Sequence, residues 1–96
     1  MFVVVLRFST HKTKAGQRAA AHNAWILRGF DDGVFLLGGG LQPGLGGVVV
    51  AHRVTRADLE RRIGEDPFVV DGIVTAEILE VAPSRTDERL AFLAAR

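Results

Sequence analysis

The segment AAAHNAWI, residues 19–26, places a histidine and a tryptophan in a run dominated by alanine. Counting along the chain by threes and fours gives a helical stripe that contains Ala15, Ala19, His22, Ile26 and Phe30. This spacing predicts an amphipathic helix whose stripe, with Trp25 beside it, packs on a hydrophobic core. We therefore expect His22 to point inward, where its imidazole needs a hydrogen-bond partner because an unpaired buried polar group costs about 1–3 kcal/mol.

Outward from this helix, apolar runs and turn signals predict the order βαββαβ with a further helix at the end. The helix around His22 is expected to end near Gly29, where glycines and aspartates follow. Strands are expected at residues 2–8, 34–37, 47–53 and 73–81. Residues 38–44 are rich in glycine and are expected to form a loop that can approach a ligand closely.

Two segments have the capping-box form that begins a helix, Thr55–Asp58 and Ser84–Asp87. The first is expected to open a helix that ends at Gly64. The second is expected to open a short terminal helix with three apolar residues to pack: Leu90, Phe92 and Leu93. The resulting order is that of the ferredoxin-like α+β fold, an antiparallel sheet with both main helices on one face.

The first strand predicts a partner for the sheet. Residues 2–8 are apolar at almost every position, so both faces of this strand are apolar. Two helices can cover only one face, and a bare apolar sheet would be an aggregation liability. We therefore expect a homodimer formed through the sheet, and the sequence leaves open whether dimers pair again into a higher oligomer.

The composition is that of an ordinary globular protein. A chain of 96 residues can build one hydrophobic core, so a single domain is expected over residues 1–96. Hydrophobic residues make up 48% and charged residues 24%, which excludes the disordered and membrane classes. The net charge is +1 and the basic residues are scattered, so we expect no nucleic-acid partner.

The cysteine and histidine content limits the remaining classes. The chain has no cysteine, which excludes a disulfide framework and is typical of a cytoplasmic protein. The apolar run at residues 2–6 is too short for a secretory or transmembrane segment, so no membrane association is expected. The histidines at 11, 22 and 52 lack the spacing of metal ligands, and we predict no metal.

Four motifs carry a resemblance to a known family: AHNAW (residues 21–25), FLLGGGLQP (35–43), EDPFV (65–69) and AEILEV (76–81). In this order they resemble the YCII-like family over nearly the whole chain. The resemblance implies a ferredoxin-like dimeric α/β barrel with a pocket near a histidine and aspartate pair. By position, His22 matches the helix histidine of the family and Asp66 the aspartate of its Asp-Pro pair. It does not imply one reaction, although one branch of the family dehydrochlorinates a chlorinated hydroxyquinol.

A histidine paired with an aspartate can move protons near neutral pH. A carboxylate that accepts from one ring nitrogen fixes the tautomer and leaves the other nitrogen free as a base or acid. For His22 and Asp66 this requires a nitrogen–oxygen separation of about 2.6–3.2 Å. Each residue also has a structural interpretation, a core histidine and a turn or cap residue before proline. The residues expected to line a pocket beside the pair are Trp25, Gly39, Gly40, Pro67 and Phe68.

No cofactor motif accompanies the pair. The glycines at 38–47 do not lead into Gly-Lys-Ser/Thr, and no serine or cysteine lies in a nucleophile elbow. The sequence predicts a small cofactor-independent enzyme that transfers a proton on a small cyclic or aromatic molecule, as a lyase or isomerase, with a dehydrochlorinase-like reaction implied by the resemblance. The alternative is a non-catalytic small-molecule-binding or structural dimer. An open pocket beside His22 favours the enzyme, and an enclosed ring favours the alternative.

Overall fold

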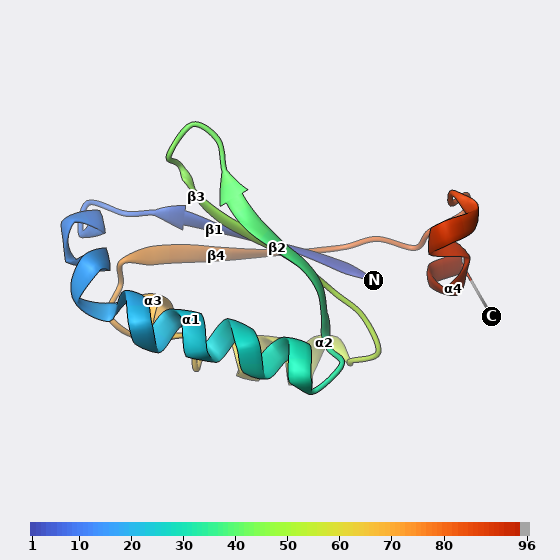
Figure 1. Cartoon of the computed structure of the whole chain (residues 1–96), viewed down its shortest axis with the longest axis horizontal. Coiled ribbons are helices and arrows are strands. Elements are labelled where there is room, and N and C mark those ends of the chain that lie inside the picture. The colour runs from blue at the N-terminus through green and yellow to red at the C-terminus, as the bar shows by residue number, and fades with distance from the viewer. Residues whose placement is uncertain (95–96) are drawn as a thin grey trace.

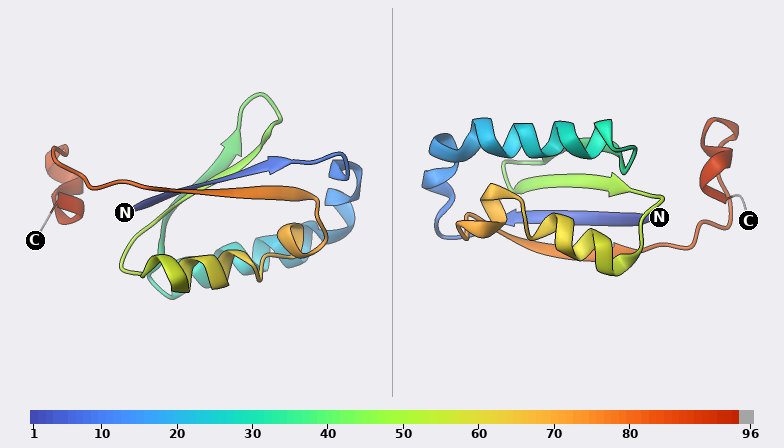
Figure 2. Two further views of the ribbon diagram at one scale, coloured as in Figure 1. Left: turned by 180° about the vertical axis from the view of Figure 1, so that it is seen from behind. Right: turned by 90° about the horizontal axis from the view of Figure 1, so that it is seen from below.

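The computed structural model describes residues 1–94 and contains a four-stranded sheet with helices α1, α2 and α3 on one face (Figure 1, Figure 2). The elements are β1 (Phe2–Phe8), η1 (Lys12–Lys14), α1 (Ala15–Asp31), β2 (Phe35–Leu41), β3 (Gly46–Ala51), α2 (Arg56–Ile63), α3 (Pro67–Val70), β4 (Val74–Glu80), η2 (Glu88–Leu90) and α4 (Ala91–Ala94). The strand order is β2-β3-β1-β4, and every neighbouring pair is antiparallel. The predicted ferredoxin-like α+β fold is confirmed.

The core lies between the sheet and helices α1 and α2. The cross-strand pair Val4↔Val49 lies on the helix-facing side of the sheet, and both side chains belong to the core. Trp25 of α1 is 1% exposed and packs into the same cluster. Its Nε1 donates a hydrogen bond to the carbonyl of Arg62 over 3.0 Å, which ties α1 to the end of α2. The core therefore fixes the position of α1 relative to the segment that follows α2.

Gly29, the predicted end of the first helix, lies inside it, because α1 continues to Asp31. A Cβ on Gly29 would overlap the ring of Phe35. The glycine therefore allows α1 to pack closely on the start of β2 rather than ending the helix. The chain turns at Gly33, where φ is +73°.

Helix α1 meets the core beside the predicted stripe rather than along it. The buried residues of the helix are Trp25 and Gly29. Ile26 is partly buried against the core, whereas Phe30 is 40% exposed. The expectation that the stripe through His22 and Phe30 faces the core is therefore wrong in part, because the buried face is rotated toward Trp25.

Residues 38–40 belong to strand β2 and do not form the predicted loop. Gly38 pairs with Val49 and Gly40 with Gly47, so pairing with β3 maintains the strand despite the weak β propensity of glycine. The turn follows β2, and the tip of the hairpin projects from the rest of the molecule (Figure 1). The edge strand β2 is therefore ordered at residues 38–40, although these residues have no side chains.

The two capping predictions have different outcomes. The side chain of Thr55 accepts a hydrogen bond from the amide of Asp58 over 3.1 Å and caps α2, as predicted. The second prediction is wrong, because Asp87 rather than Ser84 provides the cap, for the short helix η2. The stretch from Ser84 to Asp87 has no helical residues.

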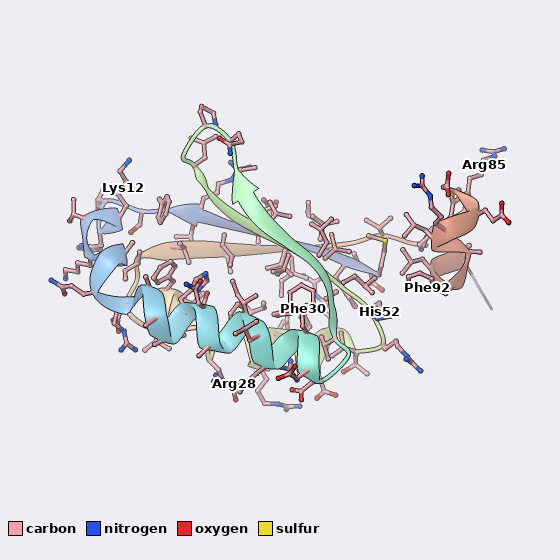
Figure 3. The ribbon with its side chains drawn as sticks, in the orientation of Figure 1. Lys12, Arg28, Phe30, His52, Arg85 and Phe92 are labelled. Carbon is pink, nitrogen blue, oxygen red and sulfur yellow. The ribbon has the colours of Figure 1, made fainter. Side chains whose placement is uncertain are left out.

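The terminal helix α4 lies away from the sheet at the end of an extended segment (Figure 1). We expected its apolar residues to pack, but Leu90 is 46% and Phe92 51% exposed. The ring of Phe92 meets that of His52 edge to face, with centroids 5.7 Å apart (Figure 3). Within residues 1–94, no helix combines the length and apolar character needed to cross a bilayer.

Helices α1, α2 and α3 leave the opposite face of the sheet uncovered (Figure 2). A row of paired residues crosses all four strands on this face: Leu37, Val50, Val3 and Leu79. At the two ends of the row Leu37 is 55% and Leu79 44% exposed. The C-terminal segment borders one end of this row, because Leu90 and Phe92 line a hollow together with Leu37 and Val50. The apolar row matches the two-sided apolar character of residues 2–8.

Candidate active site

The structure brings His22 and Asp66 together although 44 residues separate them in the chain. His22 comes from the middle of α1, and Asp66 from the short connection between α2 and α3. The distance from His22 Nδ1 to Asp66 Oδ1 is 2.7 Å, within the hydrogen-bonding range that the proposed pairing requires.

Asp66 also caps α3. Its Oδ1 accepts a hydrogen bond from the amide of Phe68 over 3.0 Å, and Pro67 occupies the first turn of the helix, where the missing N–H is not needed. The sequence presented the cap and the histidine partner as alternatives, whereas one carboxylate oxygen does both. The cap therefore orients the carboxylate that faces His22.

These contacts fix the tautomer of His22. Asp66 Oδ1 accepts from the amide of Phe68, and as a carboxylate oxygen it accepts from the ring as well, so His22 Nδ1 carries the proton. His22 makes no other hydrogen bond to residues 1–94, which leaves Nε2 without a protein partner. The free nitrogen can accept or return a proton.

Aromatic contacts hold the imidazole in place. The ring of Phe68 stacks on that of His22 with centroids 3.9 Å and planes 4° apart. Trp25 lies further away, with centroids 5.9 Å apart. Since the side chain of His22 is only 14% exposed, its ring has one orientation set by the stack and the hydrogen bond together.

Asp66 is a buried acid with one unpaired oxygen. Its exposure is 0%, and no other charged side chain in the described part of the chain is classed as buried. Within residues 1–94, Asp66 Oδ2 is buried and has no hydrogen-bond partner. Because burial of a carboxylate costs free energy unless it is paired, the contacts with His22 and with the amide of Phe68 offset the burial of Asp66.

A pocket of about 340 Å³ opens beside His22, between α1 and the β2–β3 hairpin. Apart from His22, its lining side chains are apolar, and they include Ile26, Phe30 and Phe68. Phe30 points from α1 toward β2 (Figure 3). The glycines at 38–40 and 46–47 form the facing wall. The site thus combines one ionisable ring with an apolar chamber, the usual character of a small-molecule site.

The residues expected from the sequence to line the pocket divide into two groups. Gly39, Gly40 and Phe68 lie on its wall. Trp25 is instead buried in the core, and Pro67 lies in the first turn of α3, outside the lining of this pocket. The ring of Trp25 lies beside that of His22 on the core side, so Trp25 does not reach the pocket although it is close to His22 in the sequence.

Sequence reasoning missed the role of two lining residues, Ile26 and Phe30. The three- and four-residue spacing that starts at His22 identifies both, but it was assigned to the core. Across residues 1–94, no group of three or more His, Cys, Asp or Glu side chains is placed to hold a metal ion.

Comparison with family models and with curated proteins finds no match. Among solved structures, the chain is similar to 5-chloro-2-hydroxyhydroquinone dehydrochlorinase (TftG) from Burkholderia phenoliruptrix in complex with 2,5-dihydroxybenzoquinone. The TM-score is 0.66 and the identity 16%, with 84% of this chain and 93% of that chain covered. At this identity the likeness shows a shared fold alone, because proteins with one fold can catalyse many different reactions.

Proposed function

We propose that the chain is a small enzyme that transfers a proton on a small cyclic or aromatic molecule without a cofactor. The observation that carries this proposal is the placement of His22, which is hydrogen-bonded to buried Asp66 on one side and borders an open apolar pocket on the other. A histidine that served only the core would be enclosed. His22 is the proposed catalytic residue, and Asp66 is the positioning residue.

The proposed step is general acid–base catalysis. His22 Nε2 removes a proton from a hydroxyl or an acidic C–H of the bound molecule, and the resulting imidazolium is balanced by the Asp66 carboxylate. The electron pair released on the substrate then shifts within the ring. Return of the proton to another atom gives an isomerase, and departure of a leaving group such as chloride gives a lyase. Proton transfer of this kind contributes roughly 10²–10⁴-fold to the rate.

The proposed family is the YCII-like family. Its support is the ordered set of motifs around His22 and Asp66, together with a fold similar to that of a dehydrochlorinase. Within the proposal, a dehydrochlorinase-like elimination is one candidate reaction. The proton carrier and its partner would be the same in the isomerase and in the lyase.

The proposed active form is a homodimer through the open face of the sheet. Its support is the apolar row that ends in Leu37 and Leu79, both of which are large and exposed. A stable interface buries about 1,600 Å² in total, about half of it on each partner. Pairing would remove this surface from water without covering the pocket, which lies on the helix side.

The alternative is a dimer that binds a small molecule without reacting with it. The experiment that separates the two is a panel of chlorinated phenols, hydroquinones and lactones incubated in deuterated buffer. Chloride release and loss of exchangeable C–H signals by NMR report elimination and proton exchange. We expect turnover of one class by the wild type and a loss of at least about 100-fold in His22→Gln. Equal rates in the two proteins would contradict the proposal.

A further inference from the structure

The wall of the pocket opposite α1 has three glycines at positions of β2 and β3 that face the pocket, with Val49 beside them. Gly38 pairs with Val49, and Gly40 pairs with Gly47, which in turn pairs with Leu6. Val49 and Leu6 belong to the helix-facing core, so these three glycines face the same side. We call Gly38, Gly40 and Gly47 the glycine wall.

The backbone does not require glycine at these positions. None of the three has φ in the left-handed region. A Cβ would lie 3.5 Å from Val49 Cγ1 at Gly38, 4.0 Å from the Gly46 carbonyl oxygen at Gly40, and 3.4 Å from the Gly39 carbonyl oxygen at Gly47. These are ordinary or slightly tight contacts, so side chains would fit and would project toward the pocket.

Gly46 is the opposite case on the same hairpin. Its φ is +140°, and a Cβ there would meet the carbonyl oxygen of Leu6. The backbone conformation and the close contact with Leu6 require glycine at position 46. Neither requirement applies to the three residues of the glycine wall. Glycine weakens a strand, and where the fold does not need it, it often marks a place where a ligand approaches the backbone closely.

The facing wall is made of rings and one aliphatic side chain. His22 stacks with Phe68, and Phe30 lies 3.9 Å from the position that a Cβ on Gly38 would take. Ile26 lies between them on α1. Flat peptide groups on one wall and these side chains on the other leave a slot, which a thin molecule fills better than a puckered one.

The charge of the lining restricts the ligand further. No lysine or arginine lies among the described residues that line this pocket, and His22 is already paired with the Asp66 carboxylate. A carboxylate or phosphate on the ligand would lose its hydration here without a counter-charge.

We propose that the glycine wall binds one face of an uncharged planar ring, such as a phenol or hydroquinone, and sets the thickness of the molecule that reaches His22. This inference rests on the proposed function and names its substrate class. It makes Gly38, Gly40 and Gly47 specificity-determining residues, since any side chain on them would occupy the space of the ring.

The ligand test uses pairs of compounds that differ in one property. Binding of hydroquinone, of 1,4-cyclohexanediol and of 4-hydroxybenzoate is followed by NMR titration of the backbone amides. Hydroquinone and 1,4-cyclohexanediol differ in planarity, whereas hydroquinone and 4-hydroxybenzoate differ in charge. We expect hydroquinone to bind with shifts at the glycine wall, and the puckered diol and the charged acid to bind at least about 10-fold more weakly. Absence of hydroquinone binding, or equal binding of all three, would overturn the proposal.

The variant test uses Gly40→Val with Gly16→Val as its control. Gly16 lies in α1, outside the lining of this pocket, and a Cβ there meets nothing within 4 Å. We expect Gly40→Val to weaken hydroquinone binding at least about 10-fold and Gly16→Val to leave it within about twofold. Gly40→Ala is a milder variant if valine prevents folding, with circular dichroism as the check. Equal effects at positions 16 and 40 would contradict the glycine wall.

The glycine wall and the proposed function can be rejected independently of each other. Planar-ring binding that is lost in Gly40→Val, without turnover of any compound, would support the glycine wall and reject catalysis. Turnover that depends on His22 but is equally fast for puckered and planar substrates would support catalysis and reject the glycine wall.

Discussion

Phe68 lies flat against His22, with ring centroids 3.9 Å apart, and its backbone amide binds the same Asp66 oxygen that the histidine binds. The start of α3 therefore supplies the stacking ring, the partner carboxylate and the amide that orients this carboxylate. A four-residue helix that the sequence pattern did not predict organises the candidate site.

The two roles of Asp66 can be separated by substitution. Asp66→Asn keeps an oxygen that caps α3, so we expect the free energy of unfolding to change by less than about 1 kcal/mol. Asp66→Ala removes the cap and the partner of His22, and we expect a loss of about 1–3 kcal/mol. Urea unfolding of both variants measures the difference. Equal losses would indicate that the carboxylate charge, rather than the cap, contributes the stability.

Gly29 should not tolerate even a methyl group. Because a Cβ there would overlap the ring of Phe35, we expect Gly29→Ala to cost about 1–3 kcal/mol although alanine favours helices. Gly16→Ala is the control in the same helix, since a Cβ there meets nothing within 4 Å, and it should be neutral or stabilising by up to about 1 kcal/mol. Thermal unfolding of the two variants compares them, and a stabilised Gly29→Ala would show that α1 and β2 are not packed as described.

The open face of the sheet should determine the oligomeric state. We expect light scattering to give twice the mass of the 10.4 kDa chain for the wild type, and the mass of one chain for Leu37→Glu. The reason is that a charge buried in an apolar interface is desolvated without a partner. Leu45→Glu, also exposed but in the hairpin turn, is the control and should keep the dimer. A monomeric wild type at micromolar concentration would reject the proposed dimer.

His52 should make stability depend on pH. Burial, followed by the charge of Arg53, lowers the pKa of His52 below its usual 6.5. The unfolded chain therefore binds more protons than the folded chain as pH falls through 6.5 toward the lowered pKa. The contribution of His52 to the free energy of unfolding is fully present above this pH range. It declines as the pH falls through the range and does not change further below it. Urea unfolding at about pH 5 and about pH 8 should give a smaller pH effect in His52→Gln than in the wild type. An unchanged pH effect would contradict this assignment.

The fold could be predicted from the sequence where local signals agree with tertiary structure. Thr55 marks the start of α2 because its side chain satisfies a free helix amide, a local requirement. The apolar run at residues 2–8 identifies the central strand, because a strand that is apolar on both faces is stable where both faces are covered and kept from water. Gly29 and residues 38–40 misled the prediction, because packing against Phe35 and pairing with β3 outweigh the usual tendency of glycine to end an element.

The candidate site could be predicted in part. His22 was identified by its position in an apolar stripe, and Asp66 by its place before proline together with the family resemblance. The position of the pocket depends on the rotation of α1 about its axis, which the packing of Trp25 and Gly29 sets. Spacing along the helix gives a stripe without saying which of two adjacent stripes is buried.

The most direct test of the central claim compares rate and stability in one pair of variants. In His22→Gln the side-chain amide can still donate to Asp66 but cannot carry a proton, and Asp66→Asn keeps the cap but loses the charge. For the substrate found in the panel, we predict that kcat falls roughly 10²–10⁴-fold in both variants. The free energy of unfolding should stay within about 1 kcal/mol of the wild type. Unchanged kcat with a clear loss of stability in both variants would contradict the claim and assign the pair to the core.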